Sequence, residues 1–81
     1  MEKPTHKLLT NIYYVYSPSE FSEEAVPEYE LMKEGIDPTR PGSFHGFLYM
    51  EKGELGWFED GGFENEEGSS SRIREEYVEL I

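Results

Sequence analysis

The residues of this chain whose types and spacing suit chemistry are carboxylates. Residues 56–71, GWFEDGGFENEEGSSS, contain five acidic side chains and no basic one, and three large aromatic residues lie among the acids. An array of carboxylates attracts cations or a basic protein surface, whereas a disordered acidic tail has no need of aromatic residues. The aromatic residues therefore indicate that this acidic stretch is attached to a folded core.

Most of the negative charge lies in two blocks. The chain of 81 residues has 18 acidic and 7 basic residues, which gives a net charge of −11. Residues 17–37 have seven acids and one lysine, and residues 53–71 have six acids and no base, whereas the rest of the chain is close to neutral. This charge excludes direct binding to DNA, RNA or an anionic membrane, since each of these requires a basic face.

The spacing of the acids indicates a partner that normally binds nucleic acid. Glutamates four apart on a helix lie about 6 Å apart and alternate residues of a strand about 6.6 Å apart, close to the roughly 7 Å between neighbouring phosphates of one strand. Pairs such as Glu20/Glu24 and Glu64/Glu66 have this spacing. We therefore expect the protein to bind a basic nucleic-acid-binding protein. The candidate contact residues are Glu20, Glu23, Glu24, Glu28, Glu30, Glu34, Glu59, Asp60, Phe63, Glu64, Glu66 and Glu67.

Two roles are open for the aromatic residues of the second block, Trp57, Phe58 and Phe63. All three could pack in the core and hold the acidic stretch in place against charge repulsion. Alternatively one of them, with Phe63 as the first choice, stays exposed and inserts into an apolar pocket of the partner, since aromatic residues are frequent hot spots of interfaces.

No constellation for catalysis or for a tightly bound metal ion is found in the sequence. The chain has no cysteine, which excludes a disulfide, a cysteine nucleophile and a Cys/His zinc site. Neither His6 nor His45 has an acidic residue at a sequence spacing that would indicate a catalytic pair. Asp60, Glu64 and Glu66 do not have the spacing of a calcium-binding EF-hand loop. We expect neither an enzyme nor a cofactor, and no specific metal site.

A single small α+β domain, residues 1–81, is expected to position the acids. Residues 8–16 are rich in β-branched and aromatic residues and predict a strand. Ser17 and Glu20 fit the capping box of a helix, and residues 27–35 fit a second helical piece that begins with proline and ends at glycine.

The second half of the chain predicts the rest of an antiparallel sheet. Residues 43–60 fit a hairpin with its turn at Gly53, and residues 61–71 fit a long polar loop. Residues 72–81 fit either a helix or a final strand, and a strand is preferred because the sheet needs a further partner. The expected order is β-α-β-β-β, with a short helix packed on an antiparallel sheet.

The expected compartment is the cytoplasm. The chain has no cysteine, no apolar run of the roughly 20 residues that span a membrane, and no signal peptide. The terminal segment YVELI, if it is an exposed edge strand, could pair across a two-fold axis, so that a homodimer is possible.

In composition the chain resembles the small acidic proteins that phages make to disable the DNA-binding machinery of their hosts. The likeness lies in a short, cysteine-free, strongly acidic and aromatic-rich chain. The resemblance implies a DNA mimic that acts in the host cytoplasm as an inhibitor of a nucleoid protein, an RNA polymerase or a defence nuclease. A rival interpretation is that the acids face only water and serve solubility.

A second resemblance concerns four segments, NIYYVYSPSEF, YELMKEGID, GELGWFEDGG and EEYVELI. In this order they are similar to SH3 domains, which have an aromatic first strand, an acidic loop, a tryptophan before another acidic loop and a closing strand. This resemblance implies an alternative fold, a small all-β barrel, and an alternative function, the binding of Pro-rich or basic peptides in an aromatic groove.

Overall fold

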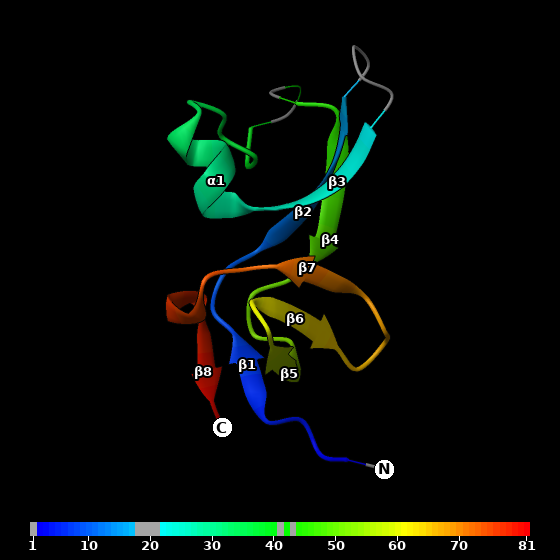
Figure 1. The fold of residues 1–81 in the computed structure, drawn as a ribbon. Coiled ribbons are helices and arrows are strands. Elements are labelled where there is room, and N and C mark those ends of the chain that lie inside the picture. The colour runs from blue at the N-terminus through cyan, green and yellow to red at the C-terminus, as the bar shows by residue number, and fades with distance from the viewer. Residues whose placement is uncertain (1, 18–21, 41, 43) are drawn as a thin grey trace.

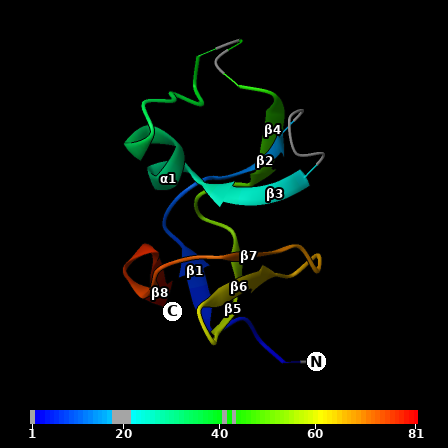
Figure 2. The same ribbon diagram turned by 45° about the horizontal axis from the view of Figure 1, so that its top comes forward.

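Two antiparallel sheets and one short helix make up the protein (Figure 1). The structure, a computed structural model, describes residues 2–17, 22–40, 42 and 44–81, and for residues 17 and 22–24 it describes the backbone alone. The larger sheet has the strand order β7-β6-β5-β1-β8 and the smaller sheet the order β3-β2-β4. Figures 1 and 2 show the smaller sheet with the helix at one end of the molecule and the larger sheet with both termini at the other.

The elements have the following bounds. The larger sheet consists of β1 (His6–Leu8), β5 (Leu55–Glu59), β6 (Gly62–Asn65), β7 (Ser70–Arg72) and β8 (Val78–Leu80). The smaller sheet consists of β2 (Ile12–Ser17), β3 (Ser22–Pro27) and β4 (Gly46–Met50). Helix α1 (Glu28–Lys33) follows β3, and a 3-10 turn, η1 (Glu75–Tyr77), precedes β8.

The strand predicted over residues 8–16 is in fact two strands that belong to different sheets. The chain leaves β1 at Leu8 and enters β2 at Ile12. Asn11 holds the crossing, because its side chain accepts a hydrogen bond of 2.7 Å from the amide of Lys52 and its carbonyl accepts one of 2.9 Å from the amide of Glu28. The β propensity was therefore interpreted correctly, but the break that separates the two sheets was not.

The helix predicted to begin at Ser17 is wrong. Strand β2 continues to Ser17 and pairs with β3, in register from Ile12 opposite Pro27 to Ser17 opposite Ser22. The glutamates after Ser22 favour a helix in isolation, but pairing with the aromatic strand β2 overrides that weak preference. The expected cap residue Glu20 lies outside the described residues.

The second helical piece is confirmed as α1. Pro27 occupies the N-cap position, and Lys33 lies in the last turn, where a positive charge suits the helix dipole. Gly35 ends the helix at φ +84°, a conformation in which glycine has no steric penalty. Leu31 faces inward and is buried.

The hairpin predicted over residues 43–60 is also wrong. A turn forms at Gly53, but the two strands on either side of it pair with other strands. Strand β4 pairs with β2, and β5 pairs with β1 and β6. The two arms separate because Leu8 of β1 takes the main-chain groups next to the turn, through hydrogen bonds of 2.8 Å from Gly53 and 2.9 Å to Glu54.

The polar stretch 61–71, predicted as a loop, forms the hairpin of β6 and β7. The preferred final strand is confirmed as β8, at one edge of the larger sheet.

The predicted order β-α-β-β-β is wrong, since three strands precede the helix. The broader expectation of antiparallel strands with one short helix is confirmed. The alternative of an SH3-like barrel is wrong for the described part of the chain, because its sheets do not close.

The core lies where the two sheets meet. It consists of Leu8, Ile12, Met50, Phe63, Ile73 and Val78. Each sheet contributes to this cluster, so neither sheet has a complete core of its own. Strands β5 and β6, which carry acids of the second block, are therefore attached to the same core as the rest of the molecule.

Candidate functional site

Strands β5 and β6 place their side chains on two opposite faces of the larger sheet. Phe63 and Asn65 are buried on the inner face, whereas Glu64, between them, is exposed on the outer face. Trp57, which pairs with Glu64, and Glu59 belong to the same outer face. These three residues line a shallow hollow of about 290 Å³. The outer face thus carries an aromatic ring between carboxylates.

Of the two roles left open for Phe63, the alternative in which its ring stays exposed is wrong. Its ring is fully buried, with an exposed fraction of 0%, because it points into the core between Phe58 of β5 and Ser71 of β7, its two neighbours in register. Phe63 therefore anchors the acidic hairpin and is not available to a partner. Trp57 and Phe58 are both half-buried, but Phe58 packs against the core, whereas Trp57 lies on the outer face and donates a hydrogen bond of 3.1 Å to the carbonyl of Lys3.

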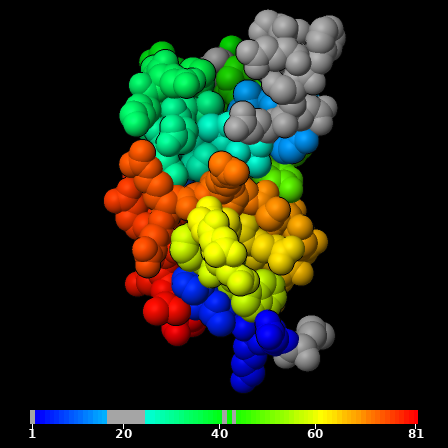
Figure 3. Space-filling view, viewed as in Figure 1, coloured from blue at the N-terminus to red at the C-terminus, as the bar shows by residue number. Residues whose placement is uncertain are grey.

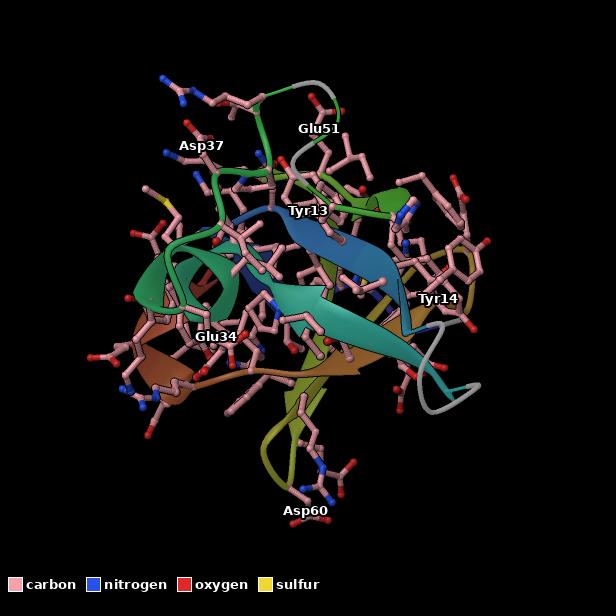
Figure 4. The ribbon with its side chains drawn as sticks, turned by 90° about the horizontal axis from the view of Figure 1, so that it is seen from above. Tyr13, Tyr14, Glu34, Asp37, Glu51 and Asp60 are labelled. Atoms are coloured by element: carbon pink, nitrogen blue, oxygen red, sulfur yellow. The ribbon has the colours of Figure 1, made fainter. Side chains whose placement is uncertain are left out.

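The turn between β5 and β6 fixes two of the acids. Glu59 and Gly62 are paired, so the loop between them has two residues, Asp60 and Gly61. Both have positive φ, +50° and +77°, as expected of the primed turns that fit the twist of a β-hairpin. Asp60 projects from the tip of this hairpin, on the side of the molecule away from Glu51 (Figure 4).

Strand β5 approaches β6 closely at Gly56. A Cβ atom at this position would lie 1.9 Å from the carbonyl oxygen of Glu64. Any other residue would therefore push the two strands apart. Glycine at position 56 thus fixes the spacing of the outer face that Trp57 and Glu64 share.

The turn between β6 and β7 is fixed by one buried side chain, Asn65. Its Oδ1 atom accepts hydrogen bonds from the amides of Glu67 and Ser69, at 3.0 and 2.8 Å, and its Nδ2 atom donates one of 2.8 Å to Glu54. Main-chain hydrogen bonds of Asn65 with Ser69 and Gly68 close the same turn. The exposed Glu66 and Glu67 are therefore carried by a rigid turn, not by a mobile loop.

The acids of the first block lie elsewhere, on the smaller sheet and its helix. Glu28 and Glu30 are half-buried on α1, and Glu34 is exposed just after the helix ends. Glu23 and Glu24 lie on β3, where their backbones pair with Tyr16 and Val15 of β2. Glu20 lies outside the described residues. The helical spacing expected for Glu20 and Glu24 is wrong, since Glu24 lies on a strand.

A groove lies between the region of α1 and the region of β7. It has a volume of about 560 Å³ and is lined by Glu30 and Glu34 from the region of α1 and by Arg72 and Arg74 from the region of β7. In Figure 3 the green and cyan surface of α1 and β3 meets the orange surface of β7 along this line. Among the described side chains, the two arginines therefore lie close to the acids of α1, on the side of β7.

Asp37, the last acid of the first block, is bound within its own loop. The hydroxyl and the amide of Thr39 both donate hydrogen bonds to its Oδ1 atom. These two hydrogen bonds, the hydroxyl first, hold the pKa of Asp37 below its ordinary value of 3.8. Asp37 thus stabilises the loop that follows α1.

An aromatic cluster on the smaller sheet was not predicted from the sequence. Tyr14 of β2 lies 5.4 Å from Phe47 and 5.3 Å from Tyr49 of β4, measured between ring centroids, and Tyr16 lies 5.8 Å from Tyr14. The rings of Tyr16 and Phe47 are exposed. The alternation of tyrosines in IYYVYS was the available signal, but the partner strand β4 was not known.

The described residues contain no group of three or more His, Cys, Asp or Glu residues placed to hold a metal ion. None of the helices in the described ranges is sufficiently long and apolar to cross a bilayer.

The chain was compared with known protein families, curated proteins and solved structures, and no match was found.

Proposed function

We propose that the protein binds the basic nucleic-acid-binding surface of another protein through its acidic hairpin and competes there with DNA. The observation that carries the proposal is the β5–β6 hairpin with the turn that follows it, referred to below as the acidic hairpin (residues 55–69). Five of its acids are exposed, and the segment contains no basic residue. These acids are Glu59, Asp60, Glu64, Glu66 and Glu67.

Rigidity is what suits this hairpin to imitation of a polynucleotide. Phe63 and Asn65 are buried and attach the hairpin to the core. Its two turns fix the acids at either end of β6, a strand about 13 Å long. The carboxylates are therefore arranged before binding, and little conformational entropy is lost when a partner neutralises them. Trp57 adds a ring face between Glu59 and Glu64 against which a partner's arginine or lysine can pack.

The other acids have smaller parts in this proposal. Glu28, Glu30 and Glu34 add to the long-range attraction of a basic partner. If the protein is a phage inhibitor, as its composition suggests, it acts in the host cytoplasm. Strand β8, with Leu80 exposed, remains available for a homodimer.

The experiment uses the immobilised protein to capture proteins from a bacterial lysate, with elution by duplex DNA or by rising salt. The proposal expects captured proteins that bind DNA, elute with DNA, and lose affinity steeply with salt. The variant Glu64→Lys with Glu66→Lys should lose them. The matched control, Glu51→Lys with Glu75→Lys, changes the net charge equally at exposed acids outside the acidic hairpin and should retain them. The proposal would be contradicted if duplex DNA failed to elute the captured proteins, or if both variants lost them equally.

A second candidate function, the binding of a Pro-rich or basic peptide, is supported by the aromatic cluster of Tyr14, Tyr16, Phe47 and Tyr49. Exposed rings on neighbouring strands offer the kind of surface that proline-rich segments pack against. Such binding should be weak and tolerant of salt, and it should be lost in Phe47→Ala but not in Glu64→Lys with Glu66→Lys. The salt dependence therefore distinguishes the two functions.

A further inference from the structure

Strand β4 is an edge of the smaller sheet, and its free edge is open to solvent. It pairs with β2 on one side, and on its other side it has no strand partner within the described chain. The residues from His45 to Leu48 are all exposed, as expected if no other segment covers this edge. An open edge strand of this kind can pair with a strand of another chain.

The strand register determines which main-chain groups of β4 face the open edge. The amide of Tyr16 in β2 donates a hydrogen bond of 2.9 Å to the carbonyl of His45. Because hydrogen-bonded pairs alternate with non-hydrogen-bonded pairs along an antiparallel ladder, Phe47, two residues further on, is also bonded to β2. The N–H and C=O groups of its neighbours, Gly46 and Leu48, therefore point away from β2.

The side chains on both faces of this edge are apolar and exposed. Phe47 is 48% exposed and Leu48 is 47% exposed. Phe47 lies on the face of the aromatic cluster, where its ring stacks on that of Tyr14, and Leu48 lies on the opposite face. A strand placed along the edge would cover both side chains and remove apolar surface from water.

The charge of the chain favours this edge for contact between two copies. Each copy has a net charge of −11, so two copies repel each other in general, but residues 38–50 contain no acid. Among the other edge strands of the described sheets, β3 carries Glu23 and Glu24, β8 carries Glu79, and β7 is the short polar strand Ser70–Arg72. Strand β4 thus offers a second copy an apolar edge at which like charges do not meet.

We propose that two copies of the protein form a symmetric dimer by antiparallel pairing of their β4 strands about a two-fold axis at Phe47. Gly46 of each copy is then opposite Leu48 of the other, and the outward main-chain groups of these residues exchange hydrogen bonds across the axis. The two Phe47 rings lie next to each other, and the missing side chain at Gly46 leaves room for Leu48 of the second copy. The two smaller sheets become one continuous sheet.

A second copy fits this edge better than the proline-rich peptide of the second candidate function. Proline has no N–H group, so a proline-rich segment has few donors for the outward carbonyls of Gly46 and Leu48. Another β4 strand has donors and acceptors at matching positions and an apolar side chain on each face. The dimer does not depend on the function proposed for the acidic hairpin, which lies in the larger sheet at the other end of the molecule (Figure 1).

Sedimentation equilibrium of the wild-type protein tests for the dimer. A single pair of strands makes a small interface, so we expect a dissociation constant between about 10 μM and about 1 mM. Salt screens the repulsion between two negative chains, so the dissociation constant should fall at least about threefold between about 50 and about 500 mM sodium chloride. A protein that stays monomeric up to about 1 mM in both salts, or a dimer that salt weakens, overturns the proposal.

Two variants with equal changes in charge identify the edge. Phe47→Glu places carboxylates opposite each other across the axis and should leave the protein monomeric. Leu80→Glu introduces the same charge at an exposed position of β8, the competing edge strand, and should keep the wild-type dissociation constant. Circular dichroism verifies that both variants fold. Loss of the dimer in Leu80→Glu, with or without loss in Phe47→Glu, overturns the proposal.

Single cysteines test the position of the axis, because the chain has no cysteine of its own. Non-hydrogen-bonded residues directly opposite each other have Cα atoms about 4.5 Å apart, which a disulfide can bridge, so Phe47→Cys should form a covalent dimer under mild oxidation. In Leu48→Cys the two Cα atoms would be diagonal neighbours about 7–8 Å apart, and oxidation should be at least about tenfold slower. Equal rates on non-reducing gels, or faster oxidation of Leu48→Cys, overturn the proposed pairing.

Discussion

The side chain of Asn65 donates a hydrogen bond of 2.8 Å to the carboxylate of Glu54 and so ties the β6–β7 turn to the turn between β4 and β5. The same carboxylate accepts a hydrogen bond from the amide of Glu51. One acid of the second block is therefore used inside the structure, where it helps to hold the other acids in position.

Replacement of Asn65 should test this arrangement. Asn65→Ala leaves two amides and a carboxylate of the turns without their partner, and should lower the free energy of unfolding by about 1–3 kcal/mol. Urea unfolding measures the change. Ser70→Ala, at an exposed position of the neighbouring strand, should stay within about 0.5 kcal/mol of the wild type. A similar loss in both variants would show that Asn65 has no special role.

The close approach of β5 and β6 should make position 56 intolerant of a side chain. In Gly56→Ala the new methyl group would meet the carbonyl of Glu64, and we expect a loss of about 3 kcal/mol or more. Gly62→Ala is the matched control, because its methyl group would have its nearest contact at 3.6 Å and should change stability by less than about 1 kcal/mol. Thermal unfolding of the two variants should separate them clearly.

The opposite orientations of Phe63 and Trp57 give a third prediction. Phe63→Ala removes a fully buried ring and should cost about 3–5 kcal/mol. Trp57→Ala should cost less, because that ring is half-buried on the outer face, and should instead weaken binding of a basic partner. Urea unfolding and the lysate capture described above measure the two effects. Equal destabilisation by both changes would contradict the assignment of the two rings to opposite faces.

Alkaline pH should destabilise the fold through Tyr13. Burial of its hydroxyl, with the nearby charge of Glu28 as the next cause, raises the pKa of Tyr13 above its ordinary value of 10.0. The folded state then holds this proton more tightly than the unfolded state, so its contribution to stability is fully present below pH about 10 and is lost as the pH rises through the folded pKa.

Thermal unfolding between pH about 9 and about 11 should therefore show a fall in midpoint that is shallower in Tyr13→Phe than in the wild type. Tyr16→Phe, which alters an exposed ring of the same strand, should keep the wild-type slope. If Tyr13→Phe keeps that slope as well, Tyr13 is not the group responsible.

The elements that could be predicted from the sequence are those whose signals are local. Pro27 and Gly35 bound α1, Gly53 marks a turn, and YVELI has the composition of a strand. The pairing of strands was not predictable in this way, because it depends on residues far apart in the chain. Residues 8–16 contain no glycine or proline, so the one local sign of the crossing from one sheet to the other is Asn11, a residue type that favours turns over strands.

The candidate site was predictable to a similar degree. The exposure of Glu59, Asp60, Glu64, Glu66 and Glu67 follows from their charge. Which aromatic residue reaches the surface depends on strand register, since a shift of one residue exchanges the two faces. The Asp-Gly pair at 60–61 was a usable hairpin signal, with apolar residues on both sides, but it was interpreted as part of a loop.

Strand β1 has a consequence for the folding rate of the protein. It lies between β5 and β8, with His6 paired to both Gly56 and Leu80. Both of its neighbours in the larger sheet are therefore segments far away in the sequence. Because such non-local pairings carry a large cost in loop-closure entropy, we expect the larger sheet to form slowly and late in folding.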